Sequence, residues 1–319
     1  MSESKPIQLG LCCMNTELRG LKNPIYCSRK IIIRIIDEKG IEELKRRILL
    51  NLEDLYKMLI WNEENGIRVF RLSSELFQHK TNPKVPDYDY EFAKDHLKKI
   101  GEYAREKGHR LTFHPGQYNQ LAAINPKVYK HTLEDLQYHA EVLDLMGMGK
   151  DSVMVIHGGG TFNDKIGTKR VWAENYCILP DIIQNRLVLE NCEYSYSIKD
   201  CLDIHEMCGV PIVFDTHHHE CYKKIYPEEE FLETREYIPL ILETWKRLNI
   251  KPKFHVSEQG NGRIGKHSDF VETIPDYLLE IPEKYGIEID IMIEAKAKEQ
   301  SIKHLYKKYP QLNCKINIE

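Results

Sequence analysis

The sequence predicts an α/β fold of the (β/α)₈ barrel type, also called a TIM barrel, and three observations carry this prediction. Short apolar runs rich in β-branched residues recur about eight times along the 319-residue chain. Long amphipathic stretches separate them, so strands and helices alternate as they do in parallel βα units. Eight such units are typical of a closed barrel rather than of an open sheet. We find no linker and no internal repeat, and we therefore expect a single barrel domain over residues 1–319.

The predicted strands are short and mostly apolar, and polar residues or glycine follow each of them. Continuous apolar runs of this kind are expected where helices cover both faces of a parallel sheet. In chain order the strands are expected at residues 6–13, 67–73, 109–115, 152–158, 186–192, 211–217, 252–258 and 287–295.

The segments between the strands repeat their apolar residues at the helical period. Glycine at positions 66 and 108 follows the last periodic turn of the first two segments, as is common just after a helix. Residues 21–33 and 78–90 are expected to form long loops. The expected helices cover residues 41–65, 90–107, 127–147, 169–184, 197–208, 228–248, 270–285 and 297–308.

The composition is that of an ordinary globular protein, with 45 Lys and Arg against 49 Asp and Glu, a net charge of −4 and 42% hydrophobic residues. No apolar run is long enough to span a bilayer, and the start MSESKP lacks the apolar segment of a signal peptide. The nine cysteines are scattered without a CxxC pair, which favours reduced thiols and an intracellular location. The acidic total excludes nucleic-acid binding by overall charge alone, but a local basic surface or bound cations would allow it.

Histidine and acidic residues gather at the predicted carboxyl ends of the strands, where barrel enzymes carry their catalytic groups. A single polar residue at a strand end usually bonds to its own loop, but six successive strand ends with such residues are poorly explained in this way. They offer His114, His157, Glu190, Asp215 with His217, His218 and His219, then Lys253, His255 and Glu258, and finally Glu294.

Imidazoles mixed with carboxylates are typical ligands of Zn²⁺, Mn²⁺ or Fe²⁺. The set is larger than one tetrahedral ion needs, so we predict a cluster of two or three divalent ions. Ions about 3.5–4 Å apart, bridged by a carboxylate such as Glu190, activate water and stabilise both the attacking and the leaving oxygen of a phosphodiester. The pattern therefore predicts hydrolysis of a phosphate ester.

Two further segments refine this prediction. In 215-DTHHH-219 the spacing directs Asp215 and His218 into one pocket, and at most two of the three histidines are expected to be ligands. In 260-GNGRIGKHSD-269 the cations Arg263 and Lys266 lie in a flexible loop, where they are expected to contact the backbone if the phosphodiester belongs to DNA, and His267 is a further candidate ligand.

The string 114-HPGQY-118 makes the pattern specific. It occurs in order with 9-LGLCCMN-15, 71-RLSSEL-76, 156-IHGGG-160, 187-LVLEN-191, 214-FDTHHH-219, 254-FHVSEQG-260 and 267-HSD-269. Over most of the chain this series resembles the ultraviolet-damage endonuclease family, which is related to endonuclease IV within the xylose-isomerase-like barrels. The resemblance implies up to three divalent ions, with manganese expected and zinc or magnesium as alternatives. It also implies incision of duplex DNA immediately 5′ of ultraviolet photoproducts, namely cyclobutane dimers and 6-4 photoproducts.

The resemblance also assigns residues to roles. Glu190, Glu294 and Lys253 match catalytic positions, and the lysine is one that can be carboxylated in this family. Gln117 and Tyr118 match the pair inserted into the duplex at the lesion, and Asn15 matches a further lesion contact, whereas Leu11 stands where some relatives have a tyrosine. His79, in the loop after the second strand, is expected to fill a further ligand position, although its spacing from Ser73 and Ser74 departs from the family pattern. The matching metal positions are His114, His157, Glu190, Asp215, His218, His255, His267 and Glu294.

Three other functions remain open from the sequence. An endonuclease specific for abasic sites would share the metal ligands and differ in the inserted pair. A sugar isomerase or epimerase on the same barrel needs fewer histidines and gains nothing from an exposed Gln-Tyr pair. A damage-binding protein would use its metals only for structure. A monomer is expected to be sufficient for binding in the groove of a duplex.

Overall fold

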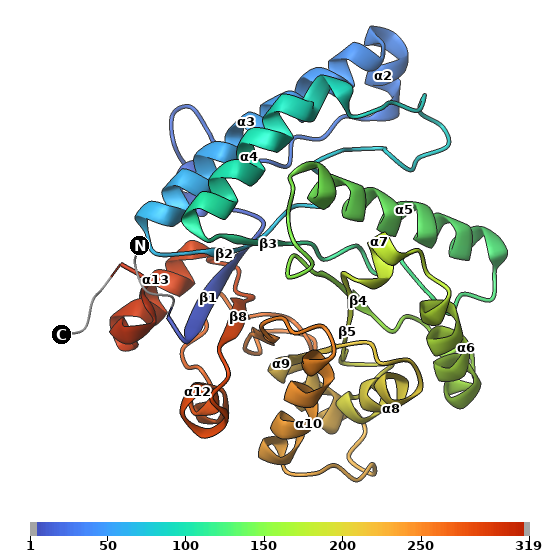
Figure 1. The fold of residues 1–319 in the computed structure, drawn as a ribbon, viewed down its shortest axis with the longest axis vertical. Helices are drawn as coiled ribbons and strands as arrows, with labels where there is room; N and C mark the ends of the chain where they lie inside the picture. Colours follow the sequence, from blue (N-terminus) through green and yellow to red (C-terminus); the bar gives the residue numbers. More distant parts are fainter. Residues whose placement is uncertain (1–4, 316–319) are drawn as a thin grey trace.

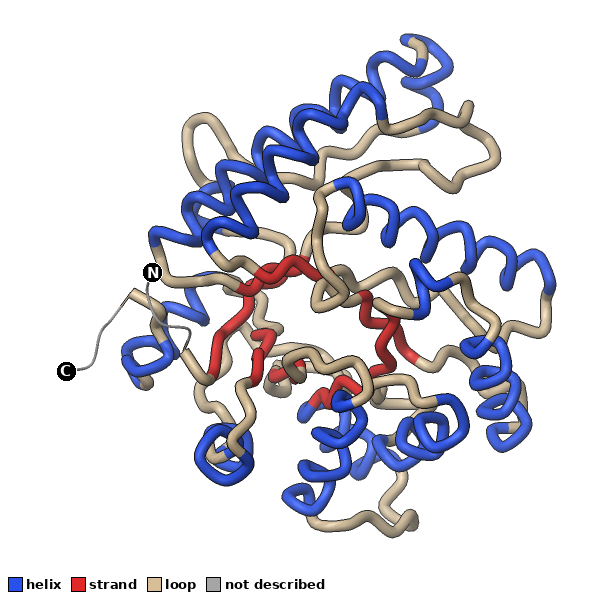
Figure 2. Tube along the Cα trace, viewed as in Figure 1, coloured by secondary structure: helices blue, strands red, loops and turns tan. Residues whose placement is uncertain are grey.

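The computed structural model describes residues 5–315, and it confirms the predicted barrel. Eight parallel strands follow the order β3-β2-β1-β8-β7-β6-β5-β4. The ring closes between β3 and β4, where Phe113 and Met154 form a parallel bridge. The amide of Phe113 donates to the carbonyl of Val153, and the amide of Val155 donates to the carbonyl of Phe113, both at 3.0 Å. Figure 2 shows the strands as a ring surrounded by helices.

Each strand lies within the range predicted for it and is shorter than that range. Most strand residues are buried, because the barrel core covers one face of the sheet and the helices cover the other. The strands are β1 (Ile7–Cys12), β2 (Val69–Arg71), β3 (Arg110–Thr112), β4 (Met154–His157), β5 (Leu187–Glu190), β6 (Ile212–Asp215), β7 (Lys253–Val256) and β8 (Ile289–Ile293).

The helices form the outer layer, and α3 and α4 pack side by side along one flank of the barrel (Figure 1). Two 3₁₀ turns, at Glu91–Ala93 and Pro310–Leu312, accompany them. The helices are α1 (Thr16–Arg19), α2 (Ile33–Lys39), α3 (Ile41–Glu64), α4 (Lys94–Lys107), α5 (Pro126–Leu145), α6 (Lys165–Cys177), α7 (Asp181–Gln184), α8 (Ile198–Cys208), α9 (Thr216–Ile225), α10 (Thr234–Lys246), α11 (Asp276–Leu279), α12 (Ile281–Tyr285) and α13 (Glu299–Lys308).

Three predicted helices were wrong in their extent, and proline explains two of them. The helix predicted over 169–184 begins earlier and is divided into α6 and α7 before and after Pro180. The helix predicted over 270–285 is present only as α11 and α12, which begin just after Pro275 and just before Pro282. The helix predicted over 228–248 begins at Thr234, and α1, α2 and α9 were not predicted at all.

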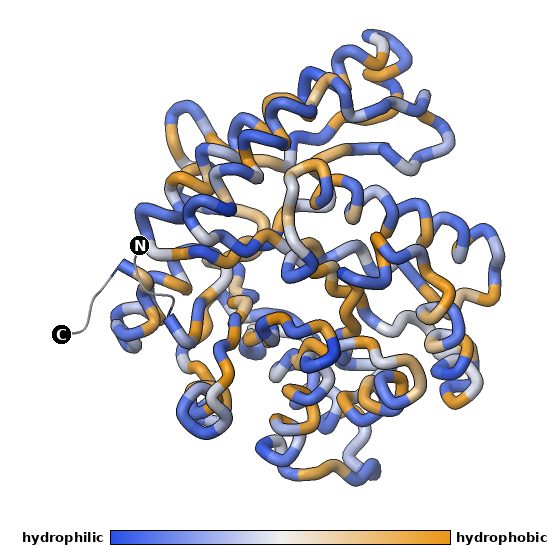
Figure 3. Tube along the Cα trace, in the orientation of Figure 1, coloured by the Kyte–Doolittle hydropathy of each residue, from blue (hydrophilic) through white to orange (hydrophobic). Residues whose placement is uncertain are grey.

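The hydrophobic core fills the barrel and continues under the helices. Figure 3 shows apolar residues concentrated in the strands and polar residues along the outer turns of the helices. A separate apolar cluster, which includes Val155, Val188 and Trp245, packs α10 against the sheet. Within residues 5–315, no helix has the length and apolar character that crossing a bilayer requires.

Candidate metal centre

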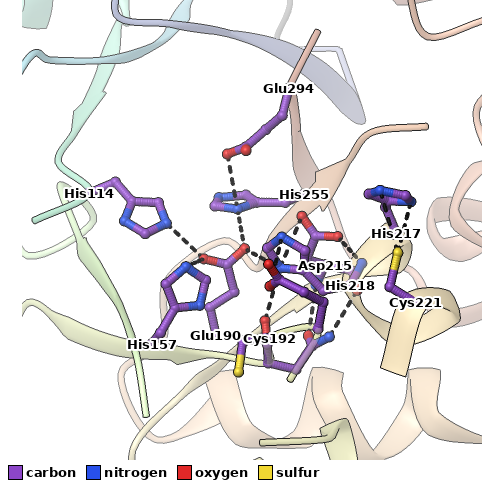
Figure 4. A network of polar contacts seen from close by, with 12 residues as sticks. His114, His157, Glu190, Cys192, Asp215, His217, His218, Cys221, His255 and Glu294 are labelled. Carbon is purple, nitrogen blue, oxygen red and sulfur yellow. Dashed lines mark hydrogen bonds and ion pairs between the residues drawn. The ribbon is translucent and has the colours of Figure 1, made fainter. Parts of the chain in front are cut away.

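Glu190, the last residue of β5, is fully buried and lies at the centre of four imidazoles (Figure 4). One carboxylate oxygen, Oε2, is 2.8 Å from His114 Nε2 and 3.7 Å from His157 Nε2. The other, Oε1, is 2.8 Å from His255 Nδ1 and 3.7 Å from His218 Nδ1. Burial alone would raise the pKa of Glu190, but the surrounding imidazoles outweigh it and hold this pKa well below its usual value. Glu190 is therefore an anion that faces ligands on both sides.

Glu294, just after β8, closes the opposite side of the site. Its carboxylate lies 3.5 Å from His255 Nδ1 and 3.8 Å from His267 Nδ1. Arg71, the last residue of β2, donates a hydrogen bond to the same carboxylate. Burial opposes ionisation of Glu294, but the charge of Arg71 and then the ring of His255 lower its pKa below the usual range. This second carboxylate is also ionised at neutral pH.

Asp215 belongs both to the site and to the start of α9. Its Oδ1 accepts a hydrogen bond from the backbone amide of His218 at 2.7 Å, so Asp215 is the N-cap of this helix. Burial raises the pKa of Asp215 to about 7. Burial opposes protonation of His218, but Asp215 and Glu190 outweigh it and raise the pKa of this imidazole to about 9. The start of α9 thus directs one carboxylate and one imidazole at Glu190.

The other two histidines of the DTHHH segment face elsewhere. His217 lies beside Cys221, with Nε2 at 3.5 Å from Sγ, away from the carboxylate of Glu190 (Figure 4). His219 packs edge-on against Phe214 and Tyr237, with ring centroids 5.4 Å and 5.6 Å away. Because consecutive residues of a helix point in different directions, only one of the three faces Glu190.

The buried polar atoms of the site fit a divalent ion. His157 Nδ1, Asp215 Oδ2 and His255 Nε2 are buried without a hydrogen-bond partner in the described part of the chain. Orphaned buried polar atoms are costly, and a metal ion satisfies them. Two groups offer ligand atoms within 4.8 Å of one another, and both contain Glu190: one adds His114 and His157, the other adds Asp215 and His218. These residues could hold ions that share one carboxylate.

Lys253 and His79 differ from the other predicted site residues. The Lys253 amine is fully buried in β7 without a hydrogen-bond partner in residues 5–315, and burial lowers its pKa to about 7. His79 lies apart from Glu190, because its Nε2 is 2.8 Å from the carbonyl of Ile31 and its Nδ1 is 3.1 Å from Asn82 Nδ2. It lines a neighbouring cavity of about 260 Å³ together with His114.

The residues predicted to contact DNA surround the mouth of the site. Gln117 and Arg263 are exposed and line a pocket of about 360 Å³ together with His114, His157, His218, His267 and Glu294. Lys266 is exposed in the same loop as Arg263. Asn15 is different, because it is buried and its Oδ1 caps α1 by accepting from the amide of Leu18 at 2.8 Å.

Sequence reasoning missed residues that contact the site, and Arg71 and Glu193 are examples. Arg71 is hydrogen-bonded to Glu294, and Glu193 Oε2 lies 3.8 Å from His218 Nε2. The sequence contains a signal for the arginine, because this residue ends the second strand in the string RLSSEL. Glu193 lies in an irregular loop, and no spacing in the sequence indicates where its side chain points.

Comparison with known families confirms the resemblance. The chain matches the model of the family UV-endonuclease UvdE over residues 7–318. A protein of Acanthamoeba polyphaga mimivirus with a provisional name as a UV-damage endonuclease is 41% identical, over 98% of this chain and 94% of that protein. The UV-damage endonuclease of Schizosaccharomyces pombe is 38% identical, over 98% of this chain and 53% of that protein, so the chain spans about half the length of this fungal relative.

Solved structures agree with this assignment. The crystal structure of SacUVDE is similar with a TM-score of 0.81 and 29% sequence identity, over 96% of this chain and all of that one. Endonuclease IV from Thermus thermophilus has a TM-score of 0.54 at 14% identity, over 81% of this chain and 94% of that one, which shows a shared barrel fold. The family match covers almost the entire chain, and the two relatives are well above 30% identical. The chain therefore belongs to the UV-endonuclease UvdE family and is a DNA-repair endonuclease that acts on ultraviolet damage.

Proposed function

We propose that the protein hydrolyses the DNA backbone immediately 5′ of cyclobutane dimers and 6-4 photoproducts, with divalent ions held around Glu190. One observation carries this proposal: a single ionised carboxylate is shared by two groups of ligand atoms beneath an open pocket. Two ions bridged by a carboxylate are a recurrent arrangement in enzymes that cleave phosphate esters. An isolated structural ion needs neither the shared carboxylate nor access to solvent.

The residues of the chain have separate tasks in this reaction. Glu190 would hold divalent ions together with both ligand groups. Glu294 would hold an ion together with His255 and His267, and Asp215 would hold one together with His218. When bound, two or three divalent ions, with Mn²⁺ proposed, supply activation of water and stabilisation of charge on the phosphate oxygens. The protein's contribution is to fix the ligands, because most of them lie at the end of a strand or at the start of α9, whereas His267 lies in the loop after β7.

Lys253 is proposed to take part in its neutral form. Burial lowers the pKa of its amine to about 7, so a substantial fraction lacks the proton at neutral pH. A neutral amine can bond to the carbon of CO₂ and release one proton, which leaves a carbamate anion in place of a cation. We propose that the carboxylated lysine adds a further oxygen ligand, and that His79 joins the ligands only after its loop moves.

Recognition of the substrate is assigned to the loops above the pocket. Arg263 and Lys266 are exposed cations that can contact phosphates without reading the sequence of bases. Gln117 and Tyr118 are proposed to enter the base stack at the lesion, where the photoproduct has already weakened pairing and stacking. Asn15 is proposed to support this contact from the N-terminus of α1.

Metal-replete protein and end-labelled duplexes test the proposal directly. The duplexes carry one cyclobutane dimer, one abasic site or no lesion. We expect a nick immediately 5′ of the dimer, loss of cleavage in chelator and recovery with Mn²⁺. Glu190→Gln should lower kcat by several orders of magnitude because it removes the shared charge, whereas Glu220→Gln, on the exposed side of α9, should not. Cleavage that persists in chelator would end the proposal.

The same assay separates the alternative functions. Preference for the abasic duplex would indicate an enzyme of the endonuclease IV type. Retention of lesion DNA without a nick in Mn²⁺ would indicate a binding protein. Interconversion of ketoses without any nicking would indicate an isomerase. Replacement of both Gln117 and Tyr118 by alanine should remove the preference for damaged DNA and leave the metal content unchanged.

We also propose that the protein works inside the cell and as a monomer. All nine cysteines are free, which is typical of a reducing compartment inside the cell. Analytical ultracentrifugation with and without duplex should show one copy per lesion if the monomer is the active form.

A further inference from the structure

The loop that carries Gln117 and Tyr118 is fixed from beneath by one carboxylate. Asp135, on α5, is only 3% exposed, whereas Tyr118 is 53% exposed. Tyr118 Oη donates a hydrogen bond to Asp135 Oδ1 at 3.3 Å, and Asn119 Nδ2 donates one to Asp135 Oδ2 at 2.8 Å. The backbone carbonyl of Asp135 in turn accepts from His139 Nδ1 at 2.7 Å. One buried side chain therefore holds two successive residues of the loop.

Further contacts tie the loop to itself and to α5. The backbone amide and the side-chain Nδ2 of Asn119 both donate to the carbonyl of Gly116, at 3.0 Å and 3.1 Å. The amide of Gln120 donates to Thr132 Oγ1 at 3.0 Å, which ties the end of the loop to α5. A Cβ at Gly116 would stand 2.5 Å from the ring of Tyr118, so the ring lies directly over this glycine. The tyrosine is thus ordered although half of it is exposed.

We propose that Asp135 is a positioning residue that sets the preference of the enzyme for damaged DNA. The inference rests on the proposed function, in which Gln117 and Tyr118 enter the base stack. Gln117 follows His114 by only three residues, so the inserted pair and one candidate metal ligand belong to one short loop. A loop that is already ordered loses little conformational entropy when it enters the duplex. Asp135 provides this order without touching the DNA or the reacting phosphate.

The chemistry of the contact explains why a carboxylate is needed here. A carboxylate has two acceptor oxygens and can therefore bind two donors at once, whereas a carboxamide offers one oxygen. Tyr118 and Asn119 each supply one donor, and both hydrogen bonds are strengthened by the charge. Asparagine at this position retains an acceptor for one of them, so it should restore part of the order that alanine loses.

Kinetics on matched duplexes tests the proposal. Asp135→Ala should lower the ratio of kcat/KM for dimer-containing over intact duplex about tenfold or more, as expected when two hydrogen bonds to a charged group are lost. The change should appear in KM, while kcat at saturating lesion DNA and the bound Mn²⁺ stay at parental levels. Asp135→Asn should recover part of the ratio. Glu134→Ala, at an exposed neighbouring position of α5, is the control and should behave as the parent.

Hydrogen exchange on the free protein provides a measurement that does not depend on cleavage. In Asp135→Ala the amides of Asn119 and Gln120 should exchange faster than in the parent, while amides of β8 keep their parental rates. Tyr118→Phe removes only the Oη bond and keeps the ring. It should lose part of the preference, and Asp135→Ala should then cost less in this background than in the parent.

The outcomes separate this inference from the proposed function. If the parental protein fails to cleave lesion DNA, the proposed function is wrong, and the exchange rates still decide whether Asp135 orders the loop. Parental exchange rates or a parental preference in folded, metal-loaded Asp135→Ala would overturn the inference. If Asp135→Ala fails to fold, Tyr118→Phe and Asn119→Ala decide, because a parental preference in both variants would show that the two hydrogen bonds to Asp135 do not set it.

Discussion

A fully buried carboxylate normally gains a proton. Glu190 and Asp215 show how the neighbouring groups decide its protonation state. Glu190 stands among four imidazoles, which hold its pKa well below the usual value. Asp215 lies nearby, but burial and the two other carboxylates of the site raise its pKa to about 7. The same residue chemistry thus gives one permanent anion and one group that titrates near neutrality. A bound cation would favour the ionised form of both.

His109 lies at the amino-terminal end of the barrel, and its pKa predicts how the stability of the protein changes in acid. Burial lowers its pKa to about 4, although Glu63 accepts a hydrogen bond from it. Between pH 6.5 and 4 the unfolded chain binds this proton and the folded chain does not, so stability must fall as the pH falls. The loss should amount to roughly 3 kcal/mol from this group.

Denaturant titrations at several pH values measure this effect. His109→Gln should reduce the decline in the free energy of unfolding between pH 6.5 and 4. His131→Gln, which replaces a histidine with an exposed ring, is the control and should keep the parental decline. Equal declines in the parent and in His109→Gln would contradict the assignment.

Most ligand candidates were predictable from the sequence because strand ends are visible in it. The run RLVLEN, for example, contains a strand and the polar residues at its end. All strands of a parallel barrel end at the same rim, so the sequence alone predicts that His114, Glu190 and Glu294 lie close together. Asp135 could not be found in this way. Its role depends on how α5 lies against the loop after β3, and no periodicity reports a contact between two separate elements.

The junction between β6 and α9 combines a helix cap with a buried acidic group. Asp215 caps α9 through the amide of His218, and the same side chain has an unpartnered buried Oδ2 among the described residues. Capping is independent of the charge, because asparagine caps helices as well as aspartate does. The two tasks of this residue can therefore be separated by one substitution.

Asp215→Asn should stabilise the protein in chelator and weaken its response to metal. The raised pKa means that the folded state of the parent loses stability as the pH rises from about 4 to about 7, and the full penalty is present at pH 8. The amide lacks this penalty, so Tm in chelator at pH 8 should rise by about 2–4 °C. Added Mn²⁺ should raise the Tm of the parent more than that of the variant. A lower Tm in chelator would contradict the prediction.

The errors in the predicted helices have local causes. Prolines at 180, 275 and 282 lie within or beside ranges that were predicted as continuous helices, and their effect was visible in the sequence. The helix that starts at Thr216 was harder to predict from the sequence, because THHH has low helix propensity and the apolar run before it is typical of a strand. Its formation depends on the cap at Asp215 and on tertiary packing.

Cations lie at both ends of the barrel, although the net charge is −4. Arg263 and Lys266 are exposed above the carboxyl ends of the strands, whereas Lys107 and Lys315 line a large cavity at the opposite end. Only the first pair lies beside the pocket over the metal ligands. If duplex DNA binds at that end, this pair is expected to displace its counterions, and the pair at the opposite end is not.

The salt dependence of DNA binding shows which end of the barrel contacts DNA. Replacement of Arg263 and Lys266 by alanine should reduce the slope of log K against log salt by about two, because each phosphate contact contributes about 0.9. Replacement of Lys107 and Lys315 should leave the slope unchanged. Equal effects of the two double variants would show that the DNA does not approach from the metal side.

The joint between β3 and β4 makes the metal centre part of the barrel's mechanical closure. These strands meet at the bridge between Phe113 and Met154, and each is followed or ended by a candidate ligand, His114 or His157, whose ring centroids are 5.1 Å apart. An ion bound by both imidazoles would add a further link across this joint, which two backbone hydrogen bonds already close. The amide of Val155, which bonds across this joint, should therefore become more resistant to exchange when Mn²⁺ is added, to a greater degree than amides between β1 and β8.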